Sequence, residues 1–319
     1  MGSSEAEFHT HGWRQALLTR CAGLPPVFTA VAHPCDAVSL QAAVEAAARG
    51  LITPILVGPE AKIHAAAQAA GVDISGFRLE PTPHSHAAAA RAVALVRSGA
   101  AQLLMKGSLH TDELMHEVMA PDTGLQTGRR ISHVYIMDVP RYPRPLMITD
   151  AAINIAPSLE DKRDIVQNAI DLAHVLGLPA PRVAILSAVE TVTSKLQSTL
   201  DAAALCKMAD RGQITGGLLD GPLAFDNAIS PEAAADKGIV SPVAGQADIL
   251  VAPDLVAGNI LAKQLTFLAG ADAAGVVVGA RVPIILTSRA DSEEARIGSC
   301  AVAVLMAHAA QAAAAGGPV

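Results

Sequence analysis

The chain alternates short runs rich in β-branched residues with longer alanine-rich stretches, and this alternation limits its fold more than any other feature. Residues 183–187 form one such short run, and residues 197–210 form the helix-length stretch that follows it. Strands that alternate with helices of this length are typical of α/β proteins with parallel strands. We therefore predict a mostly parallel sheet covered by helices.

The same pattern can be followed along the whole chain. Strands are predicted over 28–32, 53–57, 101–105, 132–138, 145–149, 183–187, 248–252, 274–278 and 283–287. Helices are predicted over 39–49, 60–70, 84–97, 112–119, 160–176, 197–210, 255–269 and 292–309. Two stretches that contain apolar residues, 120–130 and 212–227, are predicted to be loops.

Composition excludes several classes of protein. Hydrophobic residues make up 51% of the 319 residues and charged residues only 17%, which excludes a disordered chain. Aromatic residues make up 3%, too few for stacking platforms that bind single-stranded nucleic acid. The net charge of -7 argues against a general polyanion binder, although a few local arginines can still hold a phosphate.

Location and redox state follow from features that the chain lacks. The four cysteines show no CxxC spacing, so a zinc or dithiol site is not predicted and reduced thiols are expected. We expect no apolar run to reach the roughly 18–20 residues of a membrane span. The polar N-terminus carries no secretory pattern. A soluble, cytoplasmic protein without nucleic-acid or membrane partners is therefore expected.

In a parallel α/β sheet, ligands bind beyond the carboxyl ends of the strands. Ser288 and Arg289 lie between a predicted strand end and a predicted helix start. The free N–H groups of that helix favour an anion, and the Arg289 guanidinium matches phosphate geometry. An ordinary surface turn is the alternative, and the pattern alone does not decide between the two.

Other candidates lie at similar positions. Arg129 and Arg130 precede a predicted strand and could clamp a phosphate, or could be one solvated and one ion-paired arginine. Lys106 directly follows the predicted strand 101–105 and precedes a glycine that could bring backbone N–H groups to a ligand. Asp226 belongs to a Gly-Pro loop with a second aspartate, which suits a turn better than a metal. Asn154 could orient a ligand through its amide.

Six segments, in this order, resemble the phosphate acetyltransferase/phosphate butyryltransferase family over nearly the whole chain. They are ILVGPEAKI (55–63), LMKG (104–107), TGRRISH (127–133), ITDAAIN (148–154), DGPLAFD (220–226) and LTSRADS (286–292). The last segment resembles the butyryl-type branch, and also the transferase domain that is found fused to enoyl-CoA hydratase-like domains.

The resemblance implies an enzyme that moves a short acyl group reversibly between coenzyme A and inorganic phosphate, with no metal or other cofactor. It implies a fold like that of isocitrate and isopropylmalate dehydrogenases, with two α/β domains and a cleft between them. Domain I is expected over 1–140 and 275–319, and domain II over 141–274. The resemblance also implies a homodimer.

The resemblance also assigns roles to residues. Ser288 would hydrogen-bond the thioester or the thiolate, and Arg289 would hold phosphate. Further substrate-binding candidates are Lys106, Arg129, Arg130, Asn154 and Asp226. Acetyl-type members carry an arginine in the segment that corresponds to 110–116, where this chain has none, so Arg129 and Arg130 are the candidates to replace it.

The base of the reaction is the main departure from the family pattern. Acetyl-type members have an aspartate seven residues after the serine, where this chain has Ala295. Glu294 is one residue earlier, which on a helix turns its side chain by about 100°. Glu294 is therefore either a displaced base or a helix cap paired with Asp291, and we predict the cap.

Two other functions remain open. A metal-dependent dehydrogenase of the same fold would use aspartates for its metal, with Asp220 and Asp226, or Asp248 and Asp254, as the candidates. A non-catalytic acyl-CoA-binding protein would explain Ala295 and the missing arginine.

Overall fold

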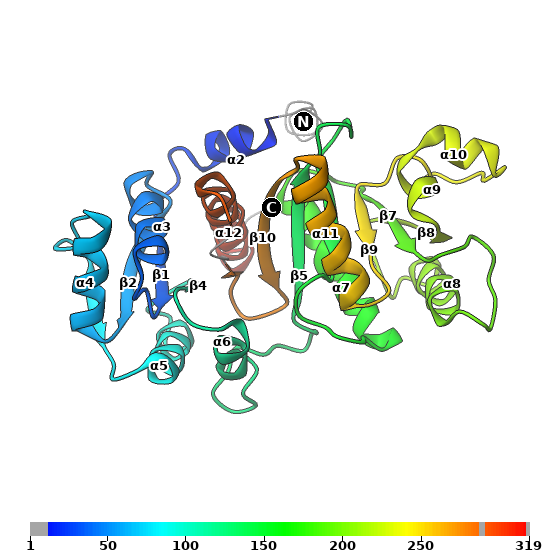
Figure 1. Cartoon of the computed structure of the whole chain (residues 1–319). Helices are drawn as coiled ribbons and strands as arrows, with labels where there is room; N and C mark the ends of the chain where they lie inside the picture. The colour runs from blue at the N-terminus through cyan, green and yellow to red at the C-terminus, as the bar shows by residue number, and fades with distance from the viewer. Residues whose placement is uncertain (1–11, 287–290, 317–319) are drawn as a thin grey trace. The chain divides into compact units, whose positions relative to one another are not determined.

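The computed structural model describes residues 12–286 and 291–316 (Figure 1). The chain divides into two compact units. The terminal unit contains Leu17–Arg129 and the described residues from Ala274 onward, and the central unit contains Arg130–Ala273 and the described residues up to Ala16. The sequence-based domains, 1–140 with 275–319 and 141–274, stay a prediction.

The terminal unit is built on a sheet in which all neighbouring strands are parallel except β10 and β11. Its strand order is β3 (Arg78–Pro81), β2 (Ile52–Gly58), β1 (Val27–Ala32), β4 (Leu103–Lys106), β11 (Ile284–Ile285) and β10 (Asp272–Val278). Its helices are α2 (Trp13–Cys21, which begins in the other unit), α3 (Ala37–Ala48), α4 (Glu60–Ala70), α5 (Ser85–Arg97), α6 (Thr111–Val118) and α12 (Glu293–Ala314).

Alanine makes this packing possible. Ala30, Val31 and Ala32 of β1 have no exposed surface, and the buried face of α3 is mostly alanine. Parallel strands are covered on both faces, so small buried side chains let the helices approach the sheet closely. Turn chemistry then sets the ends: α4 stops at Gly71, which adopts the left-handed conformation with φ of 66°.

The central unit also combines parallel and antiparallel strands. Its strand order is β5 (Ser132–Asp138), β6 (Leu146–Thr149), β9 (Ile249–Val251), β7 (Arg182–Leu186) and β8 (Leu218–Leu223). Strands β5 and β6 are antiparallel and the others are parallel. Its helices are α7 (Leu159–Val175), α8 (Gln197–Asp210), α9 (Phe225–Ile229), α10 (Pro231–Asp236) and α11 (Leu255–Ala269). The predicted mostly parallel α/β fold is confirmed.

The prediction of a loop over 212–227 was wrong, because β8 and the start of α9 lie there. Gly221 and Pro222 interrupt the apolar pattern of this strand and conceal it in the sequence. Pro222 is tolerated because β8 is at the end of the strand order and pairs only with β7. A Cβ at Gly221 would come within 2.8 Å of Ile185, so this position needs glycine.

Helix α12 corrects the expectation that no apolar run is long enough for a membrane span. Among the described helices, it alone passes that test by length and composition. More than half of its most apolar window, 56%, is buried inside the structure. A buried core helix passes the same test, and α12 packs against α3 and β11 of the terminal unit.

Candidate active site

Three parallel strands of the terminal unit end at one edge. Ala32 of β1 pairs with Lys106 of β4, and Ile285 of β11 pairs with Met105 of β4. The chain therefore leaves β1, β4 and β11 at neighbouring points, which is where ligands bind in such sheets. Ser288 and Arg289 follow β11 in the sequence but lie outside the described residues, so their roles stay predictions.

Lys106 is fixed by the loop that follows it. Its half-buried Nζ donates hydrogen bonds to the carbonyl oxygens of Gly107, at 3.2 Å, and Leu109, at 3.1 Å. A Cβ at Gly107 would lie 2.5 Å from the carbonyl oxygen of Ala32, so only glycine allows this close approach. The result is an ordered cation at the end of β4, which suits an anionic ligand.

The start of α12 differs from the prediction by one residue. Ser292 is the N-cap, and its hydroxyl accepts the N–H of Ala295 at 3.1 Å. The predicted cap formed by Asp291 and Glu294 was therefore wrong, because two adjacent polar residues compete for this position and Ser292 takes it. Glu294 is exposed in the first turn, and its role as a base stays a prediction.

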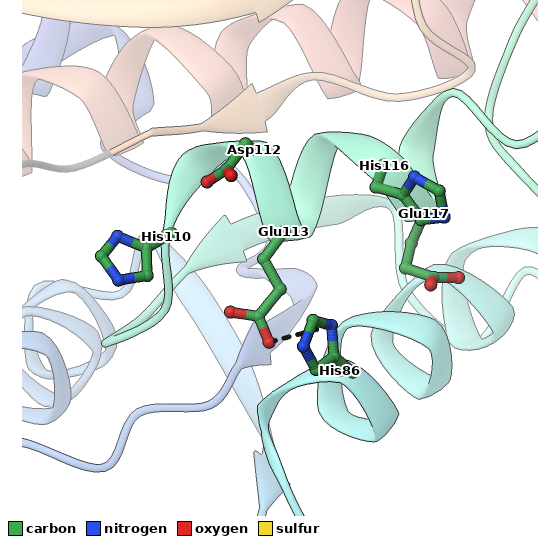
Figure 2. A pocket seen from close by; sticks show the side chains of 6 residues that line it. All are labelled: His86, His110, Asp112, Glu113, His116 and Glu117. Atoms are coloured by element: carbon green, nitrogen blue, oxygen red, sulfur yellow. Dashed lines mark ion pairs between the residues drawn. The ribbon is translucent and has the colours of Figure 1, made fainter.

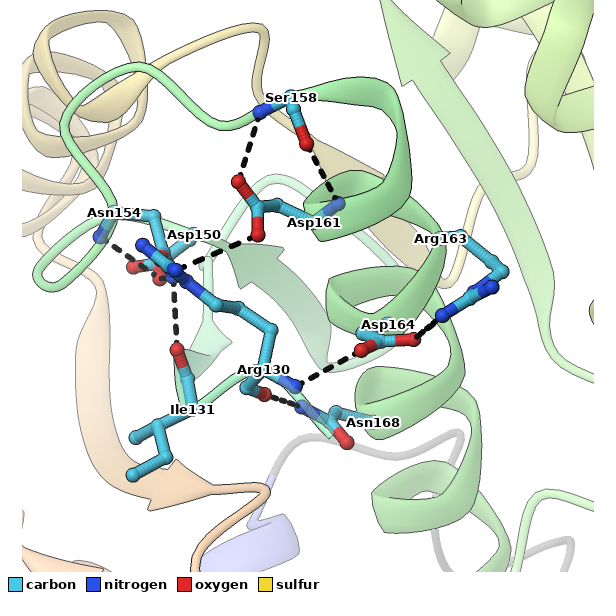
Figure 3. A network of polar contacts seen from close by, with 9 residues as sticks. All are labelled: Arg130, Ile131, Asp150, Asn154, Ser158, Asp161, Arg163, Asp164 and Asn168. Atoms are coloured by element: carbon cyan, nitrogen blue, oxygen red, sulfur yellow. Dashed lines mark hydrogen bonds and ion pairs between the residues drawn. The ribbon is translucent and has the colours of Figure 1, made fainter. Parts of the chain in front are cut away.

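The central unit joins two of the predicted substrate-binding residues. Arg130 Nε donates to Asn154 Oδ1 at 2.6 Å, and the Arg130 guanidinium also lies 3.5 Å from Asp161 (Figure 3). The Arg130 backbone N–H donates to Asp164 at 2.9 Å. Half of the Arg130 side chain is exposed, so an oriented guanidinium meets solvent here. Such a group can bind a phosphate oxygen.

A buried carboxylate organises the loop beneath Arg130. Asp150 is 4% exposed and accepts the backbone N–H groups of Ala152 and Ile153, at 2.8 and 3.0 Å. Asn154 donates to Asp150 from both its backbone and its amide, and the same amide donates to the carbonyl of Ile131 at 2.9 Å (Figure 3). These hydrogen bonds fix the side chain of Asn154, and its amide oxygen in turn orients the guanidinium of Arg130.

The remaining predicted residues lie elsewhere. Arg129 is exposed in the terminal unit, and its backbone N–H donates to Thr127 Oγ1 at 3.1 Å. The unit boundary thus falls between the two paired arginines. Asp226 is exposed at the start of α9, and within the described residues its side chain makes no hydrogen bond to the Arg130 network.

The terminal unit also contains a pocket of about 610 Å³ that sequence reasoning did not predict (Figure 2). Its lining residues are His86, His110, Asp112, Glu113, His116 and Glu117. Glu113 points toward His86, with 3.3 Å between Oε1 and Nδ1 (Figure 2). Three carboxylates make this pocket unsuitable for an anion. Within the described part of the chain, no group of three or more His, Cys, Asp or Glu residues is arranged to hold a metal ion.

Three of the four aspartates proposed for a dehydrogenase metal have other partners. Asp248 is 1% exposed and lies 3.4 Å from Arg144 and 3.8 Å from Arg182. Asp254 caps α11 by accepting the N–H of Ala257. Asp220 accepts the N–H of Gly221 at 2.8 Å. These contacts account for Asp220, Asp248 and Asp254, whereas Asp226 is exposed.

Comparison with known sequences identifies the family. Residues 81–304 match the family model described as phosphate acetyl/butaryl transferase. The chain is 69% identical to the phosphate acetyltransferase of Rhizobium meliloti, over 88% of this chain and 89% of that protein. It is 43% identical to the phosphate butyryltransferase of Clostridium beijerinckii, over 91% of this chain and 96% of that protein.

Solved structures agree with this match. A branched-chain phosphotransacylase from Enterococcus faecalis V583 is 32% identical, with a TM-score of 0.77 over 88% of this chain and 99% of that chain. A 4-hydroxythreonine-4-phosphate dehydrogenase from Burkholderia phymatum covers 89% of this chain and 99% of that chain, with a TM-score of 0.54 and 14% identity, and shows only a shared fold. The fold and these relatives thus define a class of α/β acyltransferases. The chain belongs to the phosphate acetyl/butaryl transferase family.

Proposed function

We propose that this chain transfers a short acyl group reversibly between coenzyme A and inorganic phosphate. The observation that carries the proposal is the family match over residues 81–304, together with 69% identity to a phosphate acetyltransferase. The two fixed cations, Lys106 and Arg130, support it because both substrates are anions.

The chemistry requires positioning more than a strong base. A phosphate oxygen attacks the thioester carbonyl carbon, a C–O bond forms, and the C–S bond breaks. The proton of monohydrogen phosphate passes to the departing thiolate, so the products are an acyl phosphate and free coenzyme A. Phosphate is already ionised near neutral pH, so bringing two anions together is the main task, and oriented cations perform it.

The residue roles follow from chemistry and position. We propose that Arg289 holds phosphate and that Ser288 hydrogen-bonds the thioester or thiolate. Arg130, oriented by Asn154, and Lys106 contribute positive charge to the substrates. Arg129 and Asp226 remain weaker candidates for substrate binding, and Glu294 remains the candidate for a carboxylate that receives a proton.

The length of the acyl chain is the finer question. Sequence identity alone does not distinguish an acetyltransferase from a butyryltransferase here. A phosphate acetyltransferase from Thermotoga maritima and a phosphate butyryltransferase from Clostridium acetobutylicum are both 42% identical to this chain. The 69% identity to the Rhizobium meliloti enzyme favours acetyl-CoA, whereas segment 286–292 favours butyryl-CoA. We propose acetyl-CoA, because the first comparison covers most of the chain.

Two further features complete the proposal. We propose that turnover needs no divalent metal, since substrate anions and side-chain cations supply the required charges. We also propose a homodimer. Its support is the exposed apolar face of α11 that is formed by Val256, Ile260 and Phe267.

The decisive experiment measures phosphate-dependent release of coenzyme A from acetyl-, propionyl- and butyryl-CoA, before and after extensive EDTA treatment. Arg289→Ala should weaken phosphate use by about 1.5–3 kcal/mol, because one charge-assisted contact is lost. The control is Arg211→Ala, which removes an exposed arginine at the end of α8.

Release that occurs without phosphate, or turnover that is abolished by EDTA and restored by Mg²⁺, would contradict the proposal. An unchanged KM for phosphate and an unchanged kcat in Arg289→Ala would contradict only the role of that residue. Binding of acetyl-CoA without any turnover would favour the non-catalytic alternative.

A further inference from the structure

His33 adopts a backbone conformation that non-glycine residues rarely take. Its φ is 55°, and it is the only non-glycine residue with positive φ in the described part of the chain. This left-handed conformation costs energy in L-residues and persists only where surrounding contacts enforce it. His33 directly follows Ala32, the last residue of β1, at the edge where β4 and β11 also end.

The enforcing contacts run to the loop after β4. Ser108 Oγ lies 3.3 Å from His33 Nδ1 and 3.0 Å from the His33 carbonyl oxygen. The same hydroxyl accepts the backbone N–H of Cys35 at 3.1 Å. The Ser108 backbone N–H donates to the His33 carbonyl at 2.8 Å. Ser108 is therefore fixed through both its backbone and its side chain by one strained residue.

Ser108 in turn lies between the two carbonyls that hold Lys106. These carbonyls belong to Gly107 and Leu109, the residues on either side of Ser108. Gly107 lies so close to His33 that a Cβ on it would be 2.6 Å from the His33 carbonyl oxygen. Any rotation of the peptide units around Ser108 would redirect both carbonyls, and with them the ammonium group of Lys106.

We propose that His33 is a positioning residue for the acyl transfer: it acts through Ser108 to aim Lys106 at a phosphoryl oxyanion of the substrate. This inference rests on the proposed function. Inorganic phosphate and the phosphates of coenzyme A share the chemistry that Lys106 recognises, so separate KM measurements must identify which of them it contacts.

The first test compares Lys106→Met with Ser108→Ala by steady-state kinetics, with phosphate and acetyl-CoA varied in turn. Lys106→Met identifies the substrate whose KM depends on the ammonium group. Ser108→Ala should raise that same KM by roughly five- to tenfold and leave kcat nearly unchanged, which is the effect of losing one hydrogen bond in ground-state binding. In the Lys106→Met background, Ser108→Ala should cause no further rise in KM, because Ser108 acts on the substrate only through Lys106.

His33 itself is tested by two substitutions that tolerate its backbone. His33→Gly keeps the left-handed conformation and removes the ring, so it should raise KM as Ser108→Ala does. His33→Asn also tolerates this conformation, and its amide can still bond to Ser108, so KM should stay within about twofold of the wild-type value. A purely structural role would instead reduce kcat through loss of folded enzyme, and Asn would not restore KM.

Unchanged KM values in both Ser108→Ala and His33→Gly would overturn the inference, and so would effects that multiply with Lys106→Met. Failure of the proposed function is seen separately, as a wild-type chain that releases no coenzyme A when phosphate is added. If His33→Gly does not fold, the Ser108→Ala comparison with Lys106→Met decides the matter alone.

Discussion

His133 in β5 is a buried histidine that its surroundings keep neutral. It is 2% exposed, its ring meets that of Tyr135 edge to face at 4.4 Å, and its Nδ1 is buried without a hydrogen-bond partner. Burial lowers the pKa of His133 to about 4, although the nearby carboxylate of Asp150 acts in the opposite direction. In the unfolded chain the pKa returns to about 6.5.

This difference predicts how stability depends on pH. Between pH 6.5 and 4, His133 is protonated in the unfolded chain but stays neutral in the folded chain. The free energy of unfolding that is present above pH 6.5 therefore decreases as the pH falls toward 4. The full loss is on the order of 3 kcal/mol. His133→Phe keeps a ring and cannot titrate, so its unfolding free energy, measured in urea at pH 7 and 4.5, should fall less than that of wild type. His64→Gln, at an exposed site, is the control, and a His133→Phe slope equal to wild type would refute the assignment.

At this scale the sequence could identify residue types but not their partners. Arg130 and Asn154 were separate candidates, and only the folding of the loop after β6 around Asp150 joins them. The strained backbone of His33 has no sequence signature, because φ there is set by Ser108, 75 residues away. Long-range contacts of this kind do not follow from local pattern.

Helices α7 and α8 are joined by a buried ion pair. Lys162 Nζ lies 2.6 Å from Asp201, with side chains only 8% and 10% exposed. Gln197 donates to the other carboxylate oxygen at 2.8 Å. Lys162→Met should cost about 3–5 kcal/mol of unfolding free energy, because Asp201 stays buried without its cation. Lys162→Met combined with Asp201→Leu should recover most of that loss in chemical denaturation, whereas equal losses in the single and double variants would show that the pair contributes little.

Helices and strands with a regular hydrophobic pattern could be predicted from the sequence, whereas strands without such a pattern could not. Helices 60–70 and 255–269 agree with the structure at both ends, and Gly71 and Gly270 mark where they stop. Helix 197–210 and strand 132–138 also agree at both ends, although no capping side chain marks the start of that helix. Strands β3 and β8 were missed because they are at the ends of the strand order and are only partly buried. Such strands need no continuous apolar run, so hydropathy does not reveal them.

In the described part of the central unit, helix α11 presents an exposed apolar face. Only Gly258 and Ala262 of the fifteen residues of α11 are buried, while Val256, Ile260 and Phe267 are 62%, 52% and 72% exposed. Spacings of four and seven residues place these three side chains on one face of the helix. Helix α11 contains no acidic residue although the chain has a net charge of -7, and Lys263 is its only charged side chain, so few like charges oppose a contact of this face with itself.

If the chain forms the homodimer proposed above, this face predicts that the two copies meet through α11. Light scattering coupled to size-exclusion chromatography should give wild type the mass of two chains. Ile260→Glu with Phe267→Glu should give the mass of one chain, because four carboxylates would then meet in an apolar contact. Val240→Glu is the matched control, since Val240 is a fully exposed apolar residue outside α11 and the same new charge there should leave the dimer intact. A wild-type monomer, or a double variant that stays dimeric, would show that α11 does not join two copies of this chain.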